Sequence, residues 1–314
     1  MELSVICPTF NEIKFIDQLC ESLCIDDGIE KEILFADGGS TDGTRGRIEE
    51  WKKKYAFIKV VDNPGRYATP GFNRAYKIST GKYVAFVGAH ATYPENYFSS
   101  ALQYLKAGEC DVAGGPLKQE GKTTMGKAIA LVMSSKMGVG DTEFRTAKEK
   151  MYVDSVAFAV YKREVFERAG LMDESLPVNQ DDEFHYRINK MRFRILMVPE
   201  MQAVYFVRGS LKKLFLQYYK YGLYKPLVLR KVKGSVRMRH LIPSAFLLYL
   251  LSLPLALITT WWLIPLLLYF LFISATIIKF EAGMRIKIYC YPVFPVLHVS
   301  YGAGFLFGLF KAKK

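Results

Sequence analysis

The chain of 314 residues is predicted to be an α/β protein followed by a helical membrane region. In its first two-thirds, short apolar runs alternate with longer amphipathic or charged runs. This order of strands and helices is typical of a parallel, doubly wound sheet with right-handed crossovers. From Leu241 to Ile278 no residue is charged, as expected of segments that cross a membrane.

The predicted elements follow one another closely along the chain. Apolar runs of strand length lie at 3–7, 32–36, 58–61, 83–87 and 111–113. Helices are expected between them at 12–24, 42–55, 69–79 and 94–107. After residue 116 the pattern is looser, with a helix at 124–136, a polar loop at 139–150, a strand at 153–161, a helix at 163–169 and strands at 193–198 and 203–207.

Three unusual clusters come directly after predicted strands. They are Pro8–Glu12, Asp37–Thr44 and Gly88–Ala91. Ligands of doubly wound sheets bind beyond the carboxyl ends of the strands. The three clusters are therefore expected to face one site.

An acidic stretch, Asn179–Arg187, opens a predicted helix with Asp181, Asp182 and Glu183 in its first turn. Carboxylates are favourable there because the helix N-terminus carries partial positive charge and unpaired N–H groups. The same spacing also allows one carboxylate to act as a general base. The residues alone leave both interpretations open.

The net charge of +13 is concentrated in one stretch. From Arg208 to Arg239 there are ten Lys or Arg residues and no acid, with tyrosines interleaved. A basic, aromatic stretch is one signature of nucleic-acid binding. Because this one adjoins a membrane segment, attraction to anionic lipid headgroups is the preferred interpretation, and no nucleic-acid partner is expected.

The N-terminus is not typical of a signal peptide, since it lacks a basic region and Pro8 interrupts the first apolar run. The first domain is therefore expected in the cytoplasm. The five cysteines lack the paired spacing of zinc sites, which favours a reduced compartment.

The membrane region is expected to leave the cytoplasm over 241–259 and to return over 261–278. A third apolar run, 288–310, ends in lysines that a full crossing would place outside. The positive-inside tendency therefore favours a re-entrant or interface-lying last segment, although a third crossing stays open. Gly304 and Gly308 could form a close-packing helix face, within the chain or between protomers.

The chain resembles the family-2 glycosyltransferases of the GT-A fold, in particular membrane-anchored enzymes of the succinoglycan, or exopolysaccharide, type. The resemblance covers roughly residues 3–310. It depends on Pro8–Glu12, Asp37–Thr44, Asn63-Pro64-Gly65-Arg66 with Gly71-Phe72-Asn73-Arg74, Asp181–Arg187, and His298-x-Ser300-Tyr301-Gly302-x-Gly304. It implies a Rossmann-like mixed sheet in a cytoplasmic catalytic domain at 1–209, basic amphipathic interface helices at 210–240, and a membrane-embedded region at 241–314.

The resemblance also implies a nucleotide-sugar site, with a UDP-linked donor expected. Thr9 and Glu12 would contact the base or ribose, Asp37 the base edge, and Arg66 or Arg74 the diphosphate. The alternative for Asp37–Ser40 is a tight turn between strand and helix. The residues assigned to nucleotide-sugar binding are Pro8, Thr9, Glu12, Asp37, Gly39, Arg66, Asn73, Arg74, Gly88 and Ala89.

One departure concerns the metal. Related enzymes of this type commonly carry Asp-Ala-His-Ala where this chain has Gly88–Ala91. His90 matches the metal-ligand position, so a divalent cation, Mn²⁺ or Mg²⁺, is expected with water and diphosphate oxygens completing its shell. The missing Asp puts a sugar or ribose contact in doubt.

The resemblance assigns Asp181 as general base, with Asp182 beside it in the catalytic stretch. Gln180 stands where related enzymes often carry Glu. Asp154 is a second-choice carboxylate on the acceptor side, and its alternative is a turn at a strand end. Gln217 and Tyr221 are also assigned to the acceptor, which by analogy is a polyprenyl-diphosphate-linked saccharide. Related membrane synthases carry Gln-x-x-Arg-Trp near Gln217, but this Arg and Trp are absent here.

The leading hypothesis is an inverting sugar transferase at the inner membrane of a bacterium or archaeon, with a homo-oligomer as an open option. Two rivals remain. A processive polysaccharide synthase is disfavoured by the short membrane region. A catalytically inactive membrane assembly partner is favoured only by the substitutions at Gly88 and Gln180.

Overall fold

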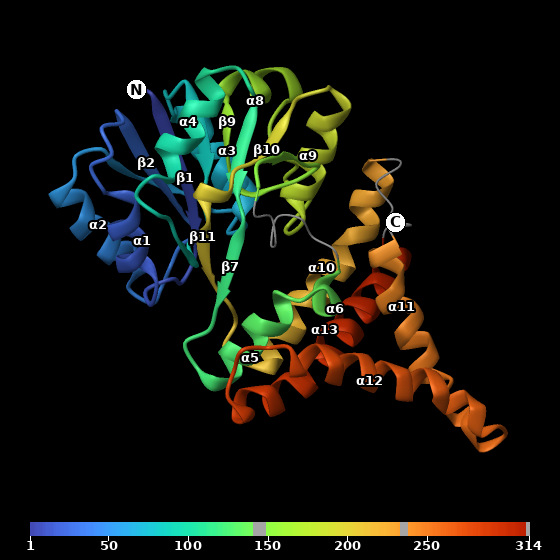
Figure 1. Cartoon of the computed structure of the whole chain (residues 1–314). Coiled ribbons are helices and arrows are strands. Elements are labelled where there is room, and N and C mark those ends of the chain that lie inside the picture. Colours follow the sequence, from blue (N-terminus) through green and yellow to red (C-terminus); the bar gives the residue numbers. More distant parts are fainter. Residues whose placement is uncertain (141–148, 233–237, 312–314) are drawn as a thin grey trace. The chain divides into compact units, whose positions relative to one another are not determined.

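The computed structural model describes residues 1–140, 149–232 and 238–311 (Figure 1). The chain divides into two units, one made of 1–118 with 143–205 and the other of 119–142 with 206–314. The division after residue 205 lies close to the expected boundary at 209. Residues 119–142, which were expected in the catalytic domain, group instead with the C-terminal helices. The two units are described separately.

The first unit contains an eight-stranded mixed sheet with the strand order β3-β2-β1-β4-β9-β6-β10-β8. Strands β1 to β4 are mutually parallel where they pair, whereas β9 runs antiparallel to both β4 and β6. The mixed sheet confirms the GT-A expectation and corrects the wholly parallel sheet expected from alternation alone. The strands are β1 (Leu3–Thr9), β2 (Lys31–Asp37), β3 (Ile58–Asp62), β4 (Tyr83–Phe86), β6 (Val112–Gly115), β8 (Met151–Tyr152), β9 (Ala157–Lys162) and β10 (Ile195–Met197).

A second sheet has three short strands in the order β5-β11-β7. These are β5 (Ala91–Thr92), β11 (Ala203–Phe206) and β7 (Leu117–Glu120). Only β11 was expected, because β5 has two residues and β7 (Leu-Lys-Gln-Glu) has a single apolar residue, so neither shows an apolar period. Since β5 directly follows His90, this pairing holds the end of the Gly88–Ala91 cluster.

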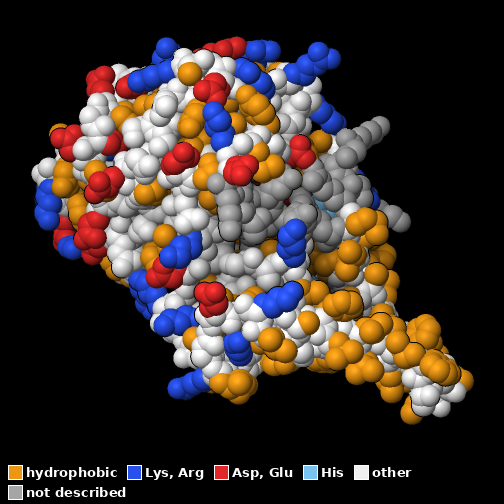
Figure 2. Space-filling view, in the orientation of Figure 1, with side chains coloured by type: hydrophobic (Ala, Val, Ile, Leu, Met, Phe, Trp, Pro, Cys, Tyr) orange, Lys and Arg blue, Asp and Glu red, His pale blue; other side chains and the backbone are white. Residues whose placement is uncertain are grey.

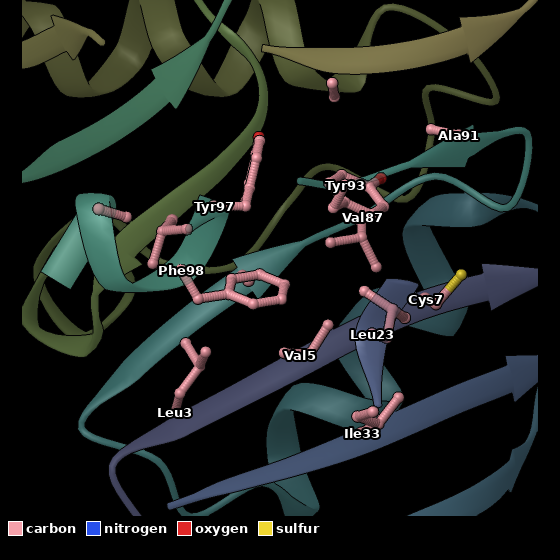
Figure 3. Packing of buried hydrophobic residues seen from close by; sticks show 14 of the residues in the cluster. Leu3, Val5, Cys7, Leu23, Ile33, Val87, Ala91, Tyr93, Tyr97 and Phe98 are labelled. Carbon is pink, nitrogen blue, oxygen red and sulfur yellow. The ribbon is translucent and has the colours of Figure 1, made fainter. Parts of the chain in front are cut away.

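Two apolar clusters cover the two faces of the main sheet. Alternate residues of β1, namely Leu3, Val5 and Cys7, point to the first cluster (Figure 3). Ile6, between them, belongs to the second cluster. The first face is covered by α1 (Ile16–Leu23), α2 (Thr44–Lys54) and α4 (Tyr97–Lys106), and the second by α3 (Ala68–Ile78), α8 (Arg163–Ala169) and α9 (Gln180–Lys190). Because helices cover both faces of the sheet, the site is expected at the carboxyl ends of its strands.

The second unit is helical. It contains α5 (Thr124–Met133), α6 (Lys136–Val139), α10 (Leu211–Lys231), α11 (Met238–Leu251), α12 (Ile264–Ile278) and α13 (Met284–Lys311). The expected basic interface segment is a single helix, α10, with exposed lysines and apolar side chains such as Lys212 and Leu216. The part of the basic run at 233–237 lies outside the described residues.

Within the described residues, two helices are long and apolar enough to cross a membrane, Thr260–Ile278 and Met284–Lys311. The expected crossing at 241–259 is wrong as one helix, because α11 ends at Leu251 and short 3₁₀ turns follow. The tip between α11 and α12 is strongly apolar and exposed, with Leu257 92% and Trp261 76% exposed (Figure 2). Such a surface suits lipid rather than water.

The last apolar run is one continuous helix of 28 residues, with Pro292 and Pro295 inside it. A re-entrant break is therefore absent from α13 as described. Its His298 Nδ1 lies 2.9 Å from the Tyr269 hydroxyl, and its Nε2 lies 3.0 Å from the carbonyl oxygen of Met137. The His298–Gly304 motif thus holds helices of the second unit together.

The glycines of that motif pack within the chain. A Cβ at Gly304 would overlap the carbonyl oxygen of Tyr219 on α10 and lie 2.9 Å from the Leu223 nitrogen. Gly308 meets the Leu223 carbonyl, and Gly222 of α10 meets that of Tyr301, in the same way. The close-packing face predicted for Gly304 and Gly308 is therefore used between α10 and α13.

Candidate active site

The first two clusters of the sequence form one interlocked structure at the carboxyl ends of β1 and β2. The Asn11 backbone N–H donates to Ser40 Oγ at 2.9 Å, and the Thr41 N–H donates to Asn11 Oδ1 at 2.9 Å. The Glu12 N–H donates to Thr44 Oγ1 at 2.7 Å. Asn11 adopts a left-handed φ of 57°, which asparagine tolerates better than most residues. The clusters therefore hold Thr9 and Glu12 in fixed positions.

Asp37 forms the tight turn that was the alternative to a base contact. Its carboxylate accepts hydrogen bonds from the Gly39 N–H at 3.2 Å and the Ser40 hydroxyl at 2.6 Å. The side chain is fully buried, and Arg45 Nη1 lies 3.7 Å away. Gly39 has a φ of 79°, so the turn requires glycine there. Asp37 thus shapes the loop, and its contact with a base stays a prediction.

Glu12 and His90 meet where β1 and β4 end. Glu12 Oε1 lies 2.8 Å from His90 Nε2, with both side chains less than one-fifth exposed. The Phe15 ring packs edge-on against the imidazole at a centroid distance of 4.6 Å. Among the described residues no three acidic, His or Cys side chains cluster as a metal site. One carboxylate and one imidazole still suit a cation whose other ligands are diphosphate oxygens and water.

Thr9 is the last residue of β1 and lies three residues before Glu12 in the sequence. Its hydroxyl is buried and makes no hydrogen bond to any part of the chain that the structure describes. A buried polar group without a partner is costly in a folded protein. The hydroxyl therefore supports the prediction that Thr9 binds a ligand. Pro8, just before it, lies within β1.

The predicted phosphate-binding arginines differ in placement. Arg66, with φ 60°, lies over the Phe10 ring at 6.0 Å. Phe10 itself is 40% exposed and was not predicted as a site residue. The sequence signal for Phe10 was an aromatic residue in the cluster that follows the first predicted strand. Arg74 is exposed on α3.

Asn73 has a structural role that its sequence position did not indicate. Its amide nitrogen donates to the Met172 carbonyl at 2.8 Å and to Glu174 Oε1 at 2.9 Å, and its amide oxygen accepts from the Met172 N–H. With these bonds formed and the side chain buried, Asn73 ties α3 to the loop before α9. Its direct contact with a nucleotide sugar stays a prediction.

The three acids of α9 are in different environments. Glu183 is buried and pairs with Arg187 at 2.9 Å, and Arg187 also donates to the carbonyls of Ala169 and Leu171. Asp181 and Asp182 are half-buried, and Asp181 Oδ1 accepts the Asp182 N–H at 2.9 Å. The helix starts after Asn179, whose φ is 62°. Glu183 is thus structural, and Asp181 and Asp182 remain the candidates for chemistry.

A buried histidine lies one turn after Asp181. His185 Nδ1 is 2.9 Å from Ser155 Oγ, and Nε2 is 2.9 Å from the Tyr161 hydroxyl of β9. Burial lowers the pKa of His185 to about 4, partly offset by Asp182, so the imidazole is neutral near pH 7. Burial and the charge of Asp181 raise the pKa of Tyr161. Sequence reasoning missed this network, although His185 follows Asp181 at helical spacing.

The predicted acceptor residues fall in both units. Asp154 is exposed, and its backbone carbonyl accepts from Asn189 Nδ2 at 2.7 Å. In the second unit, Gln217 Nε2 donates to the Tyr221 hydroxyl at 3.0 Å along one face of α10. The loop expected at 139–150 lies mostly outside the described residues.

Residues 4–170 match the family model described as glycosyl transferase family 2. The chain belongs to this family. It is 32% identical, over 98% of its length and 97% of the relative's, to a dolichyl N-acetyl-alpha-D-glucosaminyl phosphate 3-beta-D-2,3-diacetamido-2,3-dideoxy-beta-D-glucuronosyltransferase of Methanococcus voltae. It is 31% identical to the succinoglycan biosynthesis protein ExoA of Rhizobium meliloti, over 77% of this chain and 74% of ExoA.

The fold of this glycosyltransferase is shared with solved structures. The mannosyltransferase PcManGT of Pyrobaculum calidifontis, solved with GDP-Man and Mn²⁺, has a TM-score of 0.62 and 18% identity over 99% of this chain and 87% of that one. The chain is thus a family-2 glycosyltransferase with a GT-A fold.

The burial of His185 in this glycosyltransferase predicts a pH dependence of stability. An unfolded histidine has a pKa near 6.5 and the folded one about 4, so between these values only the unfolded chain binds the proton. The stability contribution is therefore complete above pH 6.5 and is lost as the pH falls towards 4, by at most about 3 kcal/mol. Denaturant unfolding of wild type and His185→Gln from pH 7 to 4 should show a shallower decline in the variant. Parallel curves would contradict the neutral, buried assignment.

Proposed function

We propose that the chain transfers a sugar, with inversion, from a UDP-linked donor to a polyprenyl-diphosphate-linked saccharide at the cytoplasmic face of the membrane. The Glu12–His90 pair, held at the ends of β1 and β4, carries the proposal. It offers one oxygen and one nitrogen ligand where a diphosphate would bind beyond the strands. The buried hydroxyl of Thr9, three residues before Glu12, has no hydrogen-bond partner among the described residues and is a proposed donor for the same ligand.

The proposed chemistry is a single displacement. Asp181 takes the proton of an acceptor hydroxyl, whose oxygen attacks the anomeric carbon of the donor. The bond from that carbon to the diphosphate oxygen breaks on the opposite face, which inverts the configuration. The half-burial of Asp181 supports this role, because a half-buried carboxylate is still accessible to a substrate. Ser155 and Tyr161 fix His185, and thereby the first turn of α9 that carries Asp181.

A divalent cation is the proposed cofactor, held by His90 together with Glu12 and by oxygens of the donor. Its chemistry would be to offset the negative charge that develops on the leaving diphosphate. Arg66 and Arg74 are both exposed, and they are proposed to help offset the same negative charge. Mn²⁺ suits this mixed donor set better than Mg²⁺, which prefers oxygen.

The acceptor assignment has separate support. The Methanococcus relative is named for a dolichyl phosphate-linked sugar. In this chain, the apolar tip between α11 and α12 and the exposed lysines of α10 suit a lipid surface with anionic headgroups. Gln217, Tyr221 and Asp154 are proposed to contact the acceptor. These features favour the inner membrane of a bacterium or archaeon.

The alternative proposal is a catalytically inactive assembly partner. Gly88 favours it because a carboxylate common in related enzymes is missing. The intact Glu12–His90 pair and the half-buried Asp181 favour the enzyme. The tight α10–α13 packing uses Gly304 and Gly308 within one chain, so these glycines do not support a homo-oligomer.

Nucleoside-diphosphate release tests the proposal. Detergent-solubilised full-length protein would be given UDP- and GDP-sugars with a lipid-linked acceptor extract, in Mn²⁺, in Mg²⁺ and in EDTA. We expect release from one UDP-sugar that requires both acceptor and cation, and that is faster in Mn²⁺. Binding of a nucleotide sugar without any release across the panel would favour the inactive partner. Release only from GDP-sugars would overturn the proposed nucleotide.

A further inference from the structure

We propose that Phe158 is a specificity-determining residue whose ring forms the wall against which the donor sugar packs. The inference builds on the proposed function and adds a residue that the motifs do not assign. Gly88 is part of the proposal, because the missing side chain at position 88 leaves space for the Phe158 ring. Three observations carry it: the fit of the ring against Gly88, the strained backbone of Phe158, and its place at the carboxyl edge of the sheet.

The ring of Phe158 occupies the space that a side chain at position 88 would need. A Cβ on Gly88 would overlap the ring edge and lie 2.7 Å from Cζ, closer than real Cβ atoms approach a neighbour. Any larger residue at position 88 therefore displaces Phe158. Positions 88 and 158 are therefore coupled, because the Phe158 ring fills the space into which a side chain at position 88 would project.

The backbone of Phe158 is strained, and its neighbours hold it. Its φ is 50°, a left-handed value that is an outlier for a bulky residue. The Tyr97 hydroxyl donates to the Phe158 carbonyl at 2.6 Å, and the Tyr93 ring packs edge-on at 5.7 Å. Tyr93 also accepts the Gly88 N–H at 2.8 Å. Strain that several contacts maintain is concentrated at functional sites.

The sheet topology places Phe158 at the site. Strand β9 is antiparallel to β4, with Ala85 opposite Val160, so the start of β9 lies beside the end of β4. Phe158 is near that start, and Gly88 follows β4, two residues before His90. The ring is only partly buried. A partly exposed ring that packs against Gly88, two residues before His90, is placed to meet the sugar attached to the diphosphate.

An aromatic face at this place offers apolar contact to the C–H groups of a sugar ring and little to the charged diphosphate. It would favour donors that present an apolar face there and reject those with an axial polar group. Phe158 should therefore affect binding of the nucleotide sugar and leave binding of the nucleoside diphosphate unchanged. This difference separates a sugar contact from a structural role.

The test is calorimetric binding with Phe158→Asn, since asparagine tolerates the left-handed backbone but lacks the ring. The ligands are the donor that wild type uses and its nucleoside diphosphate, both in Mn²⁺. We expect about tenfold weaker binding of the sugar nucleotide, a contact of roughly 1.4 kcal/mol, and less than about twofold change for the diphosphate. Phe57→Leu, a half-buried ring at the opposite end of the sheet, is the matched control and should change neither.

Equal weakening of both ligands by Phe158→Asn would overturn the proposal, because the ring would then be structural. Wild type that binds neither ligand would instead refute the proposed function. A double-mutant cycle adds an independent arm. Gly88→Ala should weaken sugar-nucleotide binding and lower Tm, and the added Phe158→Asn should restore Tm by removing the overlap. Additive Tm losses would contradict the coupling of the two positions.

Discussion

Replacing Asp181 by Asn should lower kcat for sugar transfer by roughly 10²–10⁴-fold while leaving donor binding and Tm close to wild type. The amide keeps the size of the side chain and its hydrogen bond to the Asp182 N–H, but it cannot accept the acceptor proton. Because Asp181 is half-buried and is not part of the Glu183–Arg187 ion pair, the fold should tolerate the change. Steady-state transfer and donor-binding calorimetry measure the two effects separately.

Asp182→Asn is the matched control for this experiment. It changes the adjacent carboxylate at the same helix turn and should reduce kcat far less. Residual activity of Asp181→Asn equal to wild type would refute the general-base assignment, and a large loss in Asp182→Asn alone would transfer the role to Asp182. Glu183→Gln is expected to lower Tm instead, because it breaks the buried ion pair with Arg187.

Replacing Gly304 by Ala should destabilise the second unit by about 3 kcal/mol or more, at the upper end of overpacking effects. The new methyl group would overlap the backbone carbonyl of Tyr219, and backbone cannot move aside as a flexible side chain can. Helices α10 and α13 must therefore separate along their contact. Thermal unfolding in detergent would show the loss as a lower Tm.

Gly283→Ala is the control for this substitution. A Cβ there meets no atom within 4 Å, so Tm should hardly change. Equal Tm for Gly304→Ala and wild type would contradict the α10–α13 packing. A change in oligomeric state with unchanged Tm would place Gly304 between protomers instead.

The sequence predicted the first four strands well and the second half of the sheet less well. Strands β1, β2 and β4 are mostly buried apolar runs followed by turn residues, whereas β3 is buried only at Ile58. Strand β9 was expected from residue 153, yet it starts at Ala157 and runs antiparallel to β4. Apolar periodicity carries no information on strand direction, which depends on tertiary pairing.

The membrane region shows a similar limit. Uncharged sequence over 241–278 predicted apolar helices, and α12 is one of them, but composition could not show that α11 would stop at Leu251. It also could not show that Pro292 and Pro295 would be accommodated inside α13. In a proline-containing helix, neighbouring groups can satisfy the backbone that proline leaves unpaired.

For the site, the motifs located the loops but not the partners of each side chain. The Glu12–His90 pair joins residues 78 positions apart, and Asn73 turned out to hold Met172. His185 and Phe158 lie outside the quoted nucleotide-binding motifs, and their importance comes from burial and from an unusual φ. Neither property can be read from one sequence.

The mass of the lipid-linked acceptor after incubation with donor tests the central claim most directly. Full-length protein, its preferred nucleotide sugar, Mn²⁺ and a purified polyprenyl-diphosphate-linked saccharide would be analysed by mass spectrometry, with Asp181→Asn in parallel. The account predicts one added sugar per acceptor with wild type and almost none with the variant. A ladder of many added sugars would indicate a processive synthase. Nucleoside diphosphate released with no change in acceptor mass would contradict sugar transfer to this acceptor.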